Sequence, residues 1–125
     1  MKSLAPNLIV FSVNDTIEYY REYFGFELIQ TVPDKGEFDW AMMQSVDVTL
    51  MFQKKDLSTD IPDLNETEPG GSFTLFIQVN NITDLYNKVK ENIDVIVDLN
   101  KTFYGMNEFT IRDLNGYYLT FAEPA

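Results

Sequence analysis

The sequence contains neither cysteine nor histidine among its 125 residues. Without them the chain cannot form a disulfide, use a thiol nucleophile, ligate haem through imidazole or build any of the common zinc sites. It also lacks the side chain that most often serves as a general base near neutral pH. Any catalysis would therefore have to use Asp, Glu, Tyr, Lys or the substrate itself.

Positive charge and long apolar runs are also scarce. Nine Lys and Arg face twenty Asp and Glu, for a net charge of −11. Such a surface repels phosphate backbones, so we expect no nucleic-acid partner. It suits a cationic small molecule, although an acidic surface also simply keeps a protein in solution. No stretch approaches the roughly 18 uncharged apolar residues of a membrane span. Residues 1–6 lack the apolar run of a signal peptide, so we expect a cytoplasmic protein without a membrane partner.

What is present is enough for a packed core. Apolar residues make up 45% of the chain and aromatic residues 14%. This composition is typical of a globular fold, and the length suits a single domain spanning residues 1–125.

The first half of the chain alternates one helix with several strands. Asn14, Asp15 and Thr16 are helix-capping residues, and Gly25 suits a left-handed helix end. Apolar spacing between them predicts a helix over residues 16–24. The strands predicted around it cover residues 5–11, 26–32, 37–44 and 46–53.

The second half repeats this order. Residues 54–71 are polar, carry two prolines, end in Gly70-Gly71 and are typical of a connector with room for one helical turn. A helix is predicted over residues 82–92, with Ile82, Leu85, Tyr86 and Val89 on one face. Strands are predicted over residues 72–79, 94–99, 107–113 and 117–122. Between the last two, Asn115-Gly116 predicts the positive-φ residues of a type I′ turn.

Each half is therefore predicted to have the order β-α-β-β-β. The predicted modules are residues 1–53 and 72–125, joined by the connector 54–71. A four-stranded sheet with one helix cannot cover both of its faces. We expect an α+β fold in which two βαβββ modules form a curved mixed sheet. The helices cover one face of that sheet, and the other face encloses a cleft.

Four segments in the right order resemble the glyoxalase/bleomycin resistance protein/dioxygenase superfamily, also called vicinal oxygen chelate. They are residues 10–20, the Phe24-Gly25-Phe26-Glu27-Leu28 run, residues 79–86 and residues 109–121. Together they span nearly the whole chain. Their residues have roles in packing and turns, so they indicate a fold rather than an activity.

In the metal-using members of that superfamily, His, Gln or Glu ligands come from the cleft side of four strands. The resemblance places these positions at Ala5, Thr49 or Met51, Thr74 and Thr120, and a register shifted by two brings in Asn7, Gln53 and Glu123. Methyl groups and neutral hydroxyls are poor ligands for zinc, nickel or iron. We therefore expect no transition-metal site, no cofactor and no metal-dependent enzyme. Whether Glu123, Asn7 or Gln53 binds a hard cation such as Mg²⁺ or Ca²⁺ stays open.

Strand alternation assigns a mixed aromatic and polar set to the cleft. The expected ligand-binding residues are Trp40, Met42, Met51, Phe76, Tyr104, Met106, Glu108, Arg112 and Tyr118. Methionine adapts to irregular ligands, and aromatic rings stack on planar or cationic ones. Gly105 in the Tyr104-Gly105-Met106 loop would let a ligand approach the backbone. Ordinary packing in a core or a dimer interface is an equally good interpretation of each residue.

These observations favour a metal-independent protein that binds or sequesters a small aromatic or cationic molecule, with no catalytic residue assigned. A homodimer is expected because the resemblance to the bleomycin-resistance branch implies one. Two alternatives remain. One is a lyase or isomerase of the glyoxalase type with a divergent or carboxylate-only metal site, and the other is a non-catalytic interaction domain.

Overall fold

The computed structural model describes residues 1–56 and 61–125, and residues 57–60 of the expected connector lie outside the described part. The chain folds into two compact units, Met1–Pro69 and Gly70–Ala125. Each unit holds one four-stranded mixed sheet and one α-helix. The predicted α+β fold with two βαβββ modules is thereby confirmed. That the chain acts as a single domain stays a prediction.

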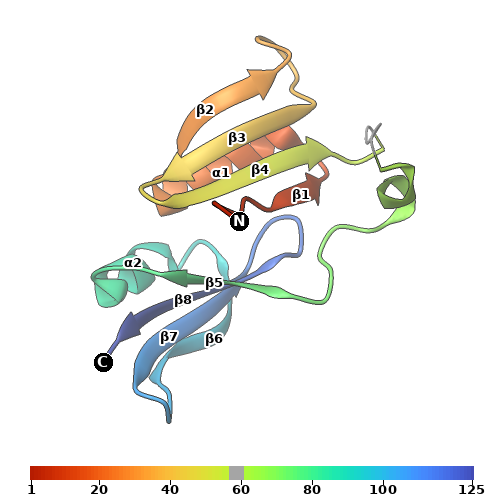
Figure 1. Cartoon of the computed structure of the whole chain (residues 1–125). Coiled ribbons are helices and arrows are strands. Elements are labelled where there is room, and N and C mark those ends of the chain that lie inside the picture. Colours follow the sequence, from red (N-terminus) through yellow and green to blue (C-terminus); the bar gives the residue numbers. More distant parts are fainter. Residues whose placement is uncertain (57–60) are drawn as a thin grey trace. The chain divides into compact units, whose positions relative to one another are not determined.

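The first unit builds its sheet from strands on both sides of one helix. Its elements are β1 (Asn7–Val10), α1 (Val13–Phe24), β2 (Glu27–Val32), β3 (Trp40–Ser45), β4 (Val48–Lys54) and a short 3₁₀ helix, η1 (Pro62–Glu66). The strands lie in the order β1-β4-β3-β2, with β1 parallel to β4 and the other pairs antiparallel. Helix α1 lies across one face of this sheet and contacts β2, β3 and β4 (Figure 1).

The core of the first unit lies between α1 and this sheet. The sheet contributes Leu8, Ala41, Met43, Leu50 and Phe52, each at most 4% exposed. Helix α1 contributes Val13, Thr16, Ile17 and Tyr20, which recur at helical spacing. The rings of Tyr20 and Phe52 lie 5.1 Å apart between their centroids. The neighbouring residues along β1, β3 and β4 therefore point to the opposite face, which helix α1 does not cover and which is called the open face below.

Helix α1 begins earlier than its capping residues suggested. Its N-cap is Ser12, whose hydroxyl accepts a hydrogen bond from the Asp15 N–H at 3.2 Å. The Asn14 side chain instead forms hydrogen bonds with the backbone of the loop after β2. Its Oδ1 accepts from the Phe38 N–H at 2.9 Å, and its Nδ2 donates to the Gly36 carbonyl at 3.0 Å. At the other end, Gly25 adopts φ +68°, which confirms the left-handed helix end.

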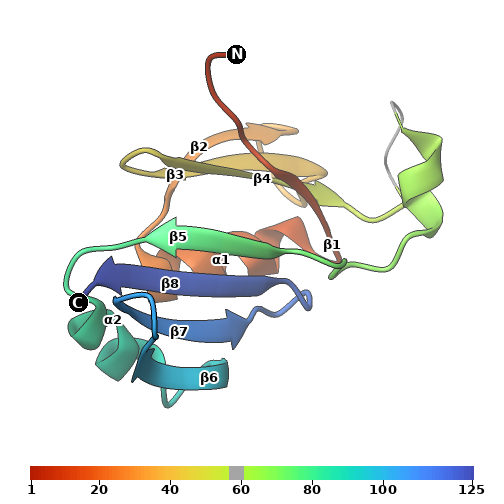
Figure 2. The same cartoon turned by 60° about the horizontal axis from the view of Figure 1, so that its bottom comes forward.

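The second unit repeats the arrangement with a shorter helix. Its elements are β5 (Thr74–Gln78), α2 (Ile82–Val89), β6 (Asp94–Lys101), β7 (Met106–Arg112) and β8 (Tyr118–Pro124). The strands lie in the order β5-β8-β7-β6, visible in Figure 2, with β5 parallel to β8. Helix α2 contacts β7 and β8.

The core of the second unit follows the predicted alternation. The sheet contributes Ile77, Phe109, Ile111, Leu119 and Phe121, each at most 9% exposed. Helix α2 buries Ile82 and Val89 against them, and the Tyr86 ring lies 5.2 Å from that of Phe109. Alternation also places Phe73 in this core, but it is 43% exposed. It precedes β5, and its ring lies 5.8 Å from the Tyr117 ring instead.

The turn between β7 and β8 differs from the predicted type I′ turn. Only Gly116 has a positive φ, at +93°, and Asn115 does not. The Asp113 carboxylate accepts hydrogen bonds from the Asn115 N–H at 2.8 Å and the Tyr117 N–H at 2.9 Å. A turn stabilised by an Asp side chain and followed by one left-handed Gly is typical of hairpin loops longer than two residues, which end in a β-bulge.

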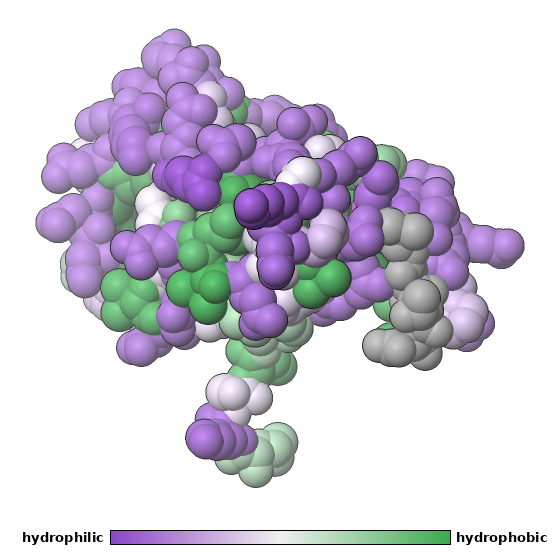
Figure 3. Space-filling model, turned by 90° about the horizontal axis from the view of Figure 1, so that it is seen from above, coloured by the Kyte–Doolittle hydropathy of each residue, from purple (hydrophilic) through white to green (hydrophobic). Residues whose placement is uncertain are grey.

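The surface carries isolated apolar side chains among polar ones. On the face drawn in Figure 3, hydrophobic patches are small and lie between hydrophilic side chains. Two hairpin turns bear the most exposed apolar side chains within the strand-containing regions, with Val46 87% and Phe103 100% exposed. Within residues 1–56 and 61–125, no helix has the length and apolar character needed to cross a membrane.

Candidate functional site

The nine residues expected to bind a ligand divide between the two units. Those on the sheet faces opposite the helices are Trp40, Met42 and Met51 in the first unit and Phe76, Met106, Glu108, Arg112 and Tyr118 in the second. Tyr104 lies in the turn between β6 and β7. The alternation along each strand thus places eight of them on open sheet faces, and only the turn residue depends on loop geometry.

The open face of the first sheet presents methionine, tryptophan and amide side chains next to one another. Met42 lies opposite Met51, and Trp40 lies opposite Gln53. The Asn7 side chain donates a hydrogen bond from Nδ2 to Gln53 Oε1 at 2.9 Å. An apolar surface with one fixed amide pair can hold a ligand by shape and by hydrogen bonding.

A polar row crosses all four strands of the second sheet on its open face. Thr74 lies opposite Tyr118, Tyr118 opposite Arg112 and Arg112 opposite Asp94. The Arg112 guanidinium donates to Asp94 Oδ2 from Nε at 3.0 Å and lies 2.8 Å from it through Nη2. This contact is the main cause that raises the pKa of Arg112, with a smaller contribution from the Tyr118 hydroxyl. Asp94 was not singled out in the sequence, because only the strand pairing brings it to Arg112.

The next row combines a ring with hydroxyl groups. Phe76 lies opposite Thr120, and Thr120 lies opposite Thr110. The two threonine Oγ1 atoms are 2.8 Å apart, so one donates a hydrogen bond to the other. Phe76 is 53% exposed although it sits within a strand. The row therefore offers an accessible ring beside a pair of hydroxyls.

A hollow of about 480 Å³ opens at the end of these rows, lined by Gly71, Ser72, Phe73, Thr74 and Tyr118. It is a shallow depression of the surface rather than an enclosed cavity. The sequence singled out only Tyr118 from this set. The Gly70-Gly71 pair was the available signal, since both glycines adopt positive φ, at +130° and +77°.

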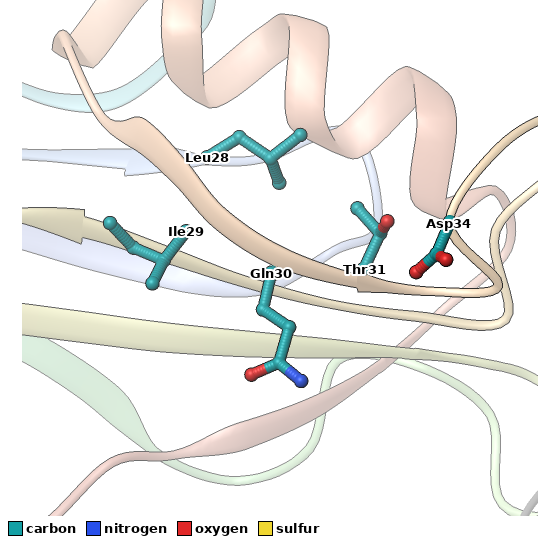
Figure 4. Close-up of a pocket in the computed structure, with 5 residues that line it drawn as sticks. All are labelled: Leu28, Ile29, Gln30, Thr31 and Asp34. Carbon is teal, nitrogen blue, oxygen red and sulfur yellow. The ribbon is translucent and has the colours of Figure 1, made fainter.

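A second hollow, of about 350 Å³, lies along the edge strand β2. It is lined by Leu28, Ile29, Gln30, Thr31 and Asp34. Figure 4 shows Gln30 and Leu28 pointing to opposite sides of the strand. None of the nine residues expected to bind a ligand lines this second hollow.

Glu108 and Tyr104 form a contact in the second unit. The Tyr104 hydroxyl donates to Glu108 Oε2 at 2.6 Å. This hydrogen bond is the main cause that raises the pKa of Tyr104. Glu108 and Arg112 lie on the same face of β7 but do not pair, because four residues of extended strand, at about 3.3 Å each, hold them too far apart. Glu108 contacts Tyr104 and Arg112 contacts Asp94 instead.

The residues at the superfamily's metal positions do not fit a transition metal. Ala5 precedes β1, and the Thr120 hydroxyl is bonded to Thr110. Glu123 points to the helix side of its sheet, where Oε2 accepts from the Asn81 N–H at 2.6 Å and Oε1 from the Ile82 N–H at 3.3 Å. Within the described part of the chain, no three His, Cys, Asp or Glu side chains gather as a metal site would need. Apart from the Glu123 carboxylate and the thioether of Met51, the donors at these positions are hydroxyls and amides, which zinc, nickel and iron bind poorly.

Solved structures share this fold at low sequence identity. TioX from Micromonospora sp. ML1 matches with a TM-score of 0.82 and 16% identity over 100% of both chains. A protein of unknown function from Agrobacterium tumefaciens matches with a TM-score of 0.81 and 15% identity, over 100% of this chain and 95% of that one. A glyoxalase/bleomycin resistance protein/dioxygenase from Nocardioides matches with a TM-score of 0.75 and 14% identity, over 98% and 83%.

Similarity at this level of identity shows the fold alone. No curated protein matches the chain significantly. The sequence model of one family, however, matches residues 3–121, nearly the whole chain. The chain belongs to the Glyoxalase/Bleomycin resistance protein/Dioxygenase superfamily.

Proposed function

We propose that the chain binds a small organic molecule on the open sheet faces and does so without a resident metal ion. The observation that carries this proposal is the open face of the second sheet. There, half-exposed Phe76 adjoins the Thr110–Thr120 hydroxyl pair, and a hollow of about 480 Å³ opens beside Tyr118. An accessible ring with a few fixed polar groups is the usual composition of a ligand site.

The chemistry of this face favours a flat, partly polar ligand. Phe76 and Tyr118 lie diagonally across β5 and β8, because Phe76 pairs with Thr120 and Thr74 pairs with Tyr118. Diagonal neighbours on paired strands are within reach of one aromatic ligand. The threonine hydroxyls donate and accept hydrogen bonds, so they can orient a ring that bears nitrogen or oxygen atoms.

The available donors support binding without a metal. The second sheet presents hydroxyls at Thr74 and Thr120, and the Glu123 carboxylate is directed to the backbone of α2. These groups support hydrogen bonding to an organic molecule better than the binding of a borderline metal. The superfamily's metal chemistry therefore has no counterpart in this proposal.

The first test is a titration with quinoxaline, a neutral bicyclic heteroaromatic compound, followed by ¹H–¹⁵N NMR. We expect the amide signals of Thr74, Phe76 and Thr120 to shift. Phe76→Ala should weaken binding at least about fivefold, because the stacking of one ring contributes roughly 1 kcal/mol beyond the area that it buries. Phe11→Ala is the matched control, since Phe11 is 54% and Phe76 53% exposed.

A thermal-shift screen over a broad panel of aromatic and cationic compounds is the second test. If no compound raises the melting temperature and no amide of the second sheet shifts, the proposal is wrong. Trp40, the single tryptophan, reports independently on the first sheet through its fluorescence. Quenching of this fluorescence would indicate binding at the first sheet itself, where Trp40, Met42 and Met51 share one face.

The enzyme alternative has its own discriminating assay. Methylglyoxal–thiol adducts are incubated with the protein, with and without nickel or zinc ions. We expect no metal-stimulated turnover, and such turnover would contradict the metal-free proposal. The homodimer implied by the superfamily stays a prediction, and sedimentation analysis at several concentrations would test it.

A further inference from the structure

Glu108 is a buried carboxylate at the edge of the proposed binding face. It lies in β7 and is only 9% exposed. Its side chain points to the open face of the second sheet, opposite Ala122 on β8 and Asn100 on β6. Charged side chains are rarely this buried unless a partner of opposite charge lies beside them.

No Lys or Arg side chain among the described residues forms an ion pair with Glu108. Its Oε2 accepts the Tyr104 hydroxyl, while Oε1 has no hydrogen bond to a described residue. The ion pairs among the described residues involve other carboxylates. The nearest lysine in sequence on β6, Lys101, lies opposite Asn107 and therefore on the other face of the sheet. One oxygen of the Glu108 carboxylate therefore lacks a hydrogen-bond donor among the described residues. No described Lys or Arg side chain forms an ion pair with it.

Two accessible aromatic rings lie in the turn before β7, one in contact with this carboxylate and the other in contact with the first ring. Tyr104 is 55% exposed and Phe103 is fully exposed. Their ring centroids lie 5.0 Å apart with the planes nearly perpendicular, at 85°. Exposed aromatic faces attract organic cations, and a carboxylate alongside strengthens that attraction. A neutral ligand would leave the charge of Glu108 uncompensated.

We propose that Glu108, together with Tyr104 and Phe103, receives the ammonium group of the ligand, as a protonated amine or a quaternary ammonium. This inference rests on the proposed small-molecule function and names the charged part of its ligand. The net charge of −11 draws cations towards the protein in general, and Glu108 supplies the specific contact. A metal ion is a poor occupant, because one carboxylate and a phenol provide far fewer oxygens than Ca²⁺ requires.

The test compares choline with 3,3-dimethylbutan-1-ol, which has the same shape but no charge. Both are titrated into the full-length protein at low ionic strength and followed by ¹H–¹⁵N NMR. We expect choline to shift the amide signals of residues 103–108 and to bind at least tenfold more tightly than the neutral alcohol. Added salt should weaken choline binding and leave the alcohol unaffected.

Glu108→Gln removes the charge and keeps an oxygen that can accept the Tyr104 hydroxyl. It should lower choline affinity about tenfold. The matched control is Glu91→Gln, an exposed glutamate of the same unit, which changes the net charge equally and should have no comparable effect. Phe103→Leu changes a fully exposed side chain, and the loss of its ring should weaken choline binding severalfold, even if the Glu108 variant folds poorly.

Equal affinities for choline and the alcohol would overturn the inference. So would equal effects of the Glu108 and Glu91 variants, which would mean that only net charge matters. The quinoxaline titration on the same samples separates the two proposals. If quinoxaline still shifts Phe76 while choline binds nowhere near Glu108, the ammonium site is wrong and the proposed function stands. If neither compound binds, the ammonium site is wrong, and the thermal-shift panel decides whether the proposed function stands.

Discussion

The Glu123 carboxylate, near the end of strand β8, caps the start of helix α2. Removing this carboxylate should destabilise the second unit. Helix α2 has no side-chain cap of its own, since Asn81 adopts φ +58° and makes no capping hydrogen bond with its side chain. Glu123, 42 residues further along the chain, accepts from the Asn81 N–H at 2.6 Å and the Ile82 N–H at 3.3 Å. It therefore satisfies two of the backbone donors that every helix start leaves open.

The expected magnitude combines two contributions. Loss of an N-terminal cap typically costs about 1 kcal/mol. Loss of a negative charge at the positive end of a helix adds roughly 0.3–1 kcal/mol. Glu123→Ala should therefore lower the free energy of unfolding by about 1–2 kcal/mol, and the melting temperature by about 4–8 °C for a chain of this size. Glu123→Gln keeps an acceptor oxygen and should lose only the smaller, electrostatic part.

Urea unfolding followed by circular dichroism measures both variants, and amide hydrogen exchange localises the effect. In Glu123→Ala the Asn81 and Ile82 amides should exchange faster, while amides of β3 and β4 keep their protection. An alanine variant as stable as the original chain, with unchanged exchange at Ile82, would refute the capping role. Mg²⁺ or Ca²⁺ should not raise the melting temperature, because the carboxylate is already occupied by the two amides.

Three further predictions concern single side chains. Val46 adopts φ +51° in the turn between β3 and β4, where a β-branched residue is strained, so Val46→Asn should raise the free energy of urea unfolding by about 1 kcal/mol. Asp113→Ala should lower it by about 2–3 kcal/mol, since two backbone N–H groups at a buried turn lose a charged acceptor, and the value for Asp113→Asn should fall between. The raised pKa of Tyr104 means that its neutral phenol is favoured in the folded state. Its contribution to stability is present below the ordinary tyrosine pKa and is lost as the pH rises through the folded value, which ¹³C NMR titration of Tyr104 in the original chain and in a Glu108→Ala variant would check.

Most of the fold could be predicted because its signals are local. The order of elements in both halves, the left-handed Gly25 and the sharing of one face by Glu108, Thr110 and Arg112 all follow from spacing and turn chemistry. The misses were at positions where several residues offer similar capping or turn chemistry. Ser12 rather than Asn14 caps α1, because Asn14 is taken by the backbone of Gly36 and Phe38.

The site was only partly predictable, because local patterns fix the face on which a residue lies but not its partner on another strand. Period-two alternation put Phe76, Arg112 and Tyr118 on an open face. It did not indicate that Arg112 pairs with Asp94, or that the Gly71–Thr74 segment forms a hollow beside Tyr118. Both depend on strand register and on a loop conformation set by two positive-φ glycines, which no local pattern specifies.

By itself the sequence determined a family, a βαβββ repeat and the absence of imidazole and thiolate ligands, since these depend only on residue types and their spacing. The tertiary structure decided where the remaining carboxylates act. Glu123 binds the start of α2, and Glu108 is buried beside Tyr104 without a cation from the described chain. The physical reason is that hydrogen bonds between distant segments require a register and a side-chain direction that arise only when the strands pair.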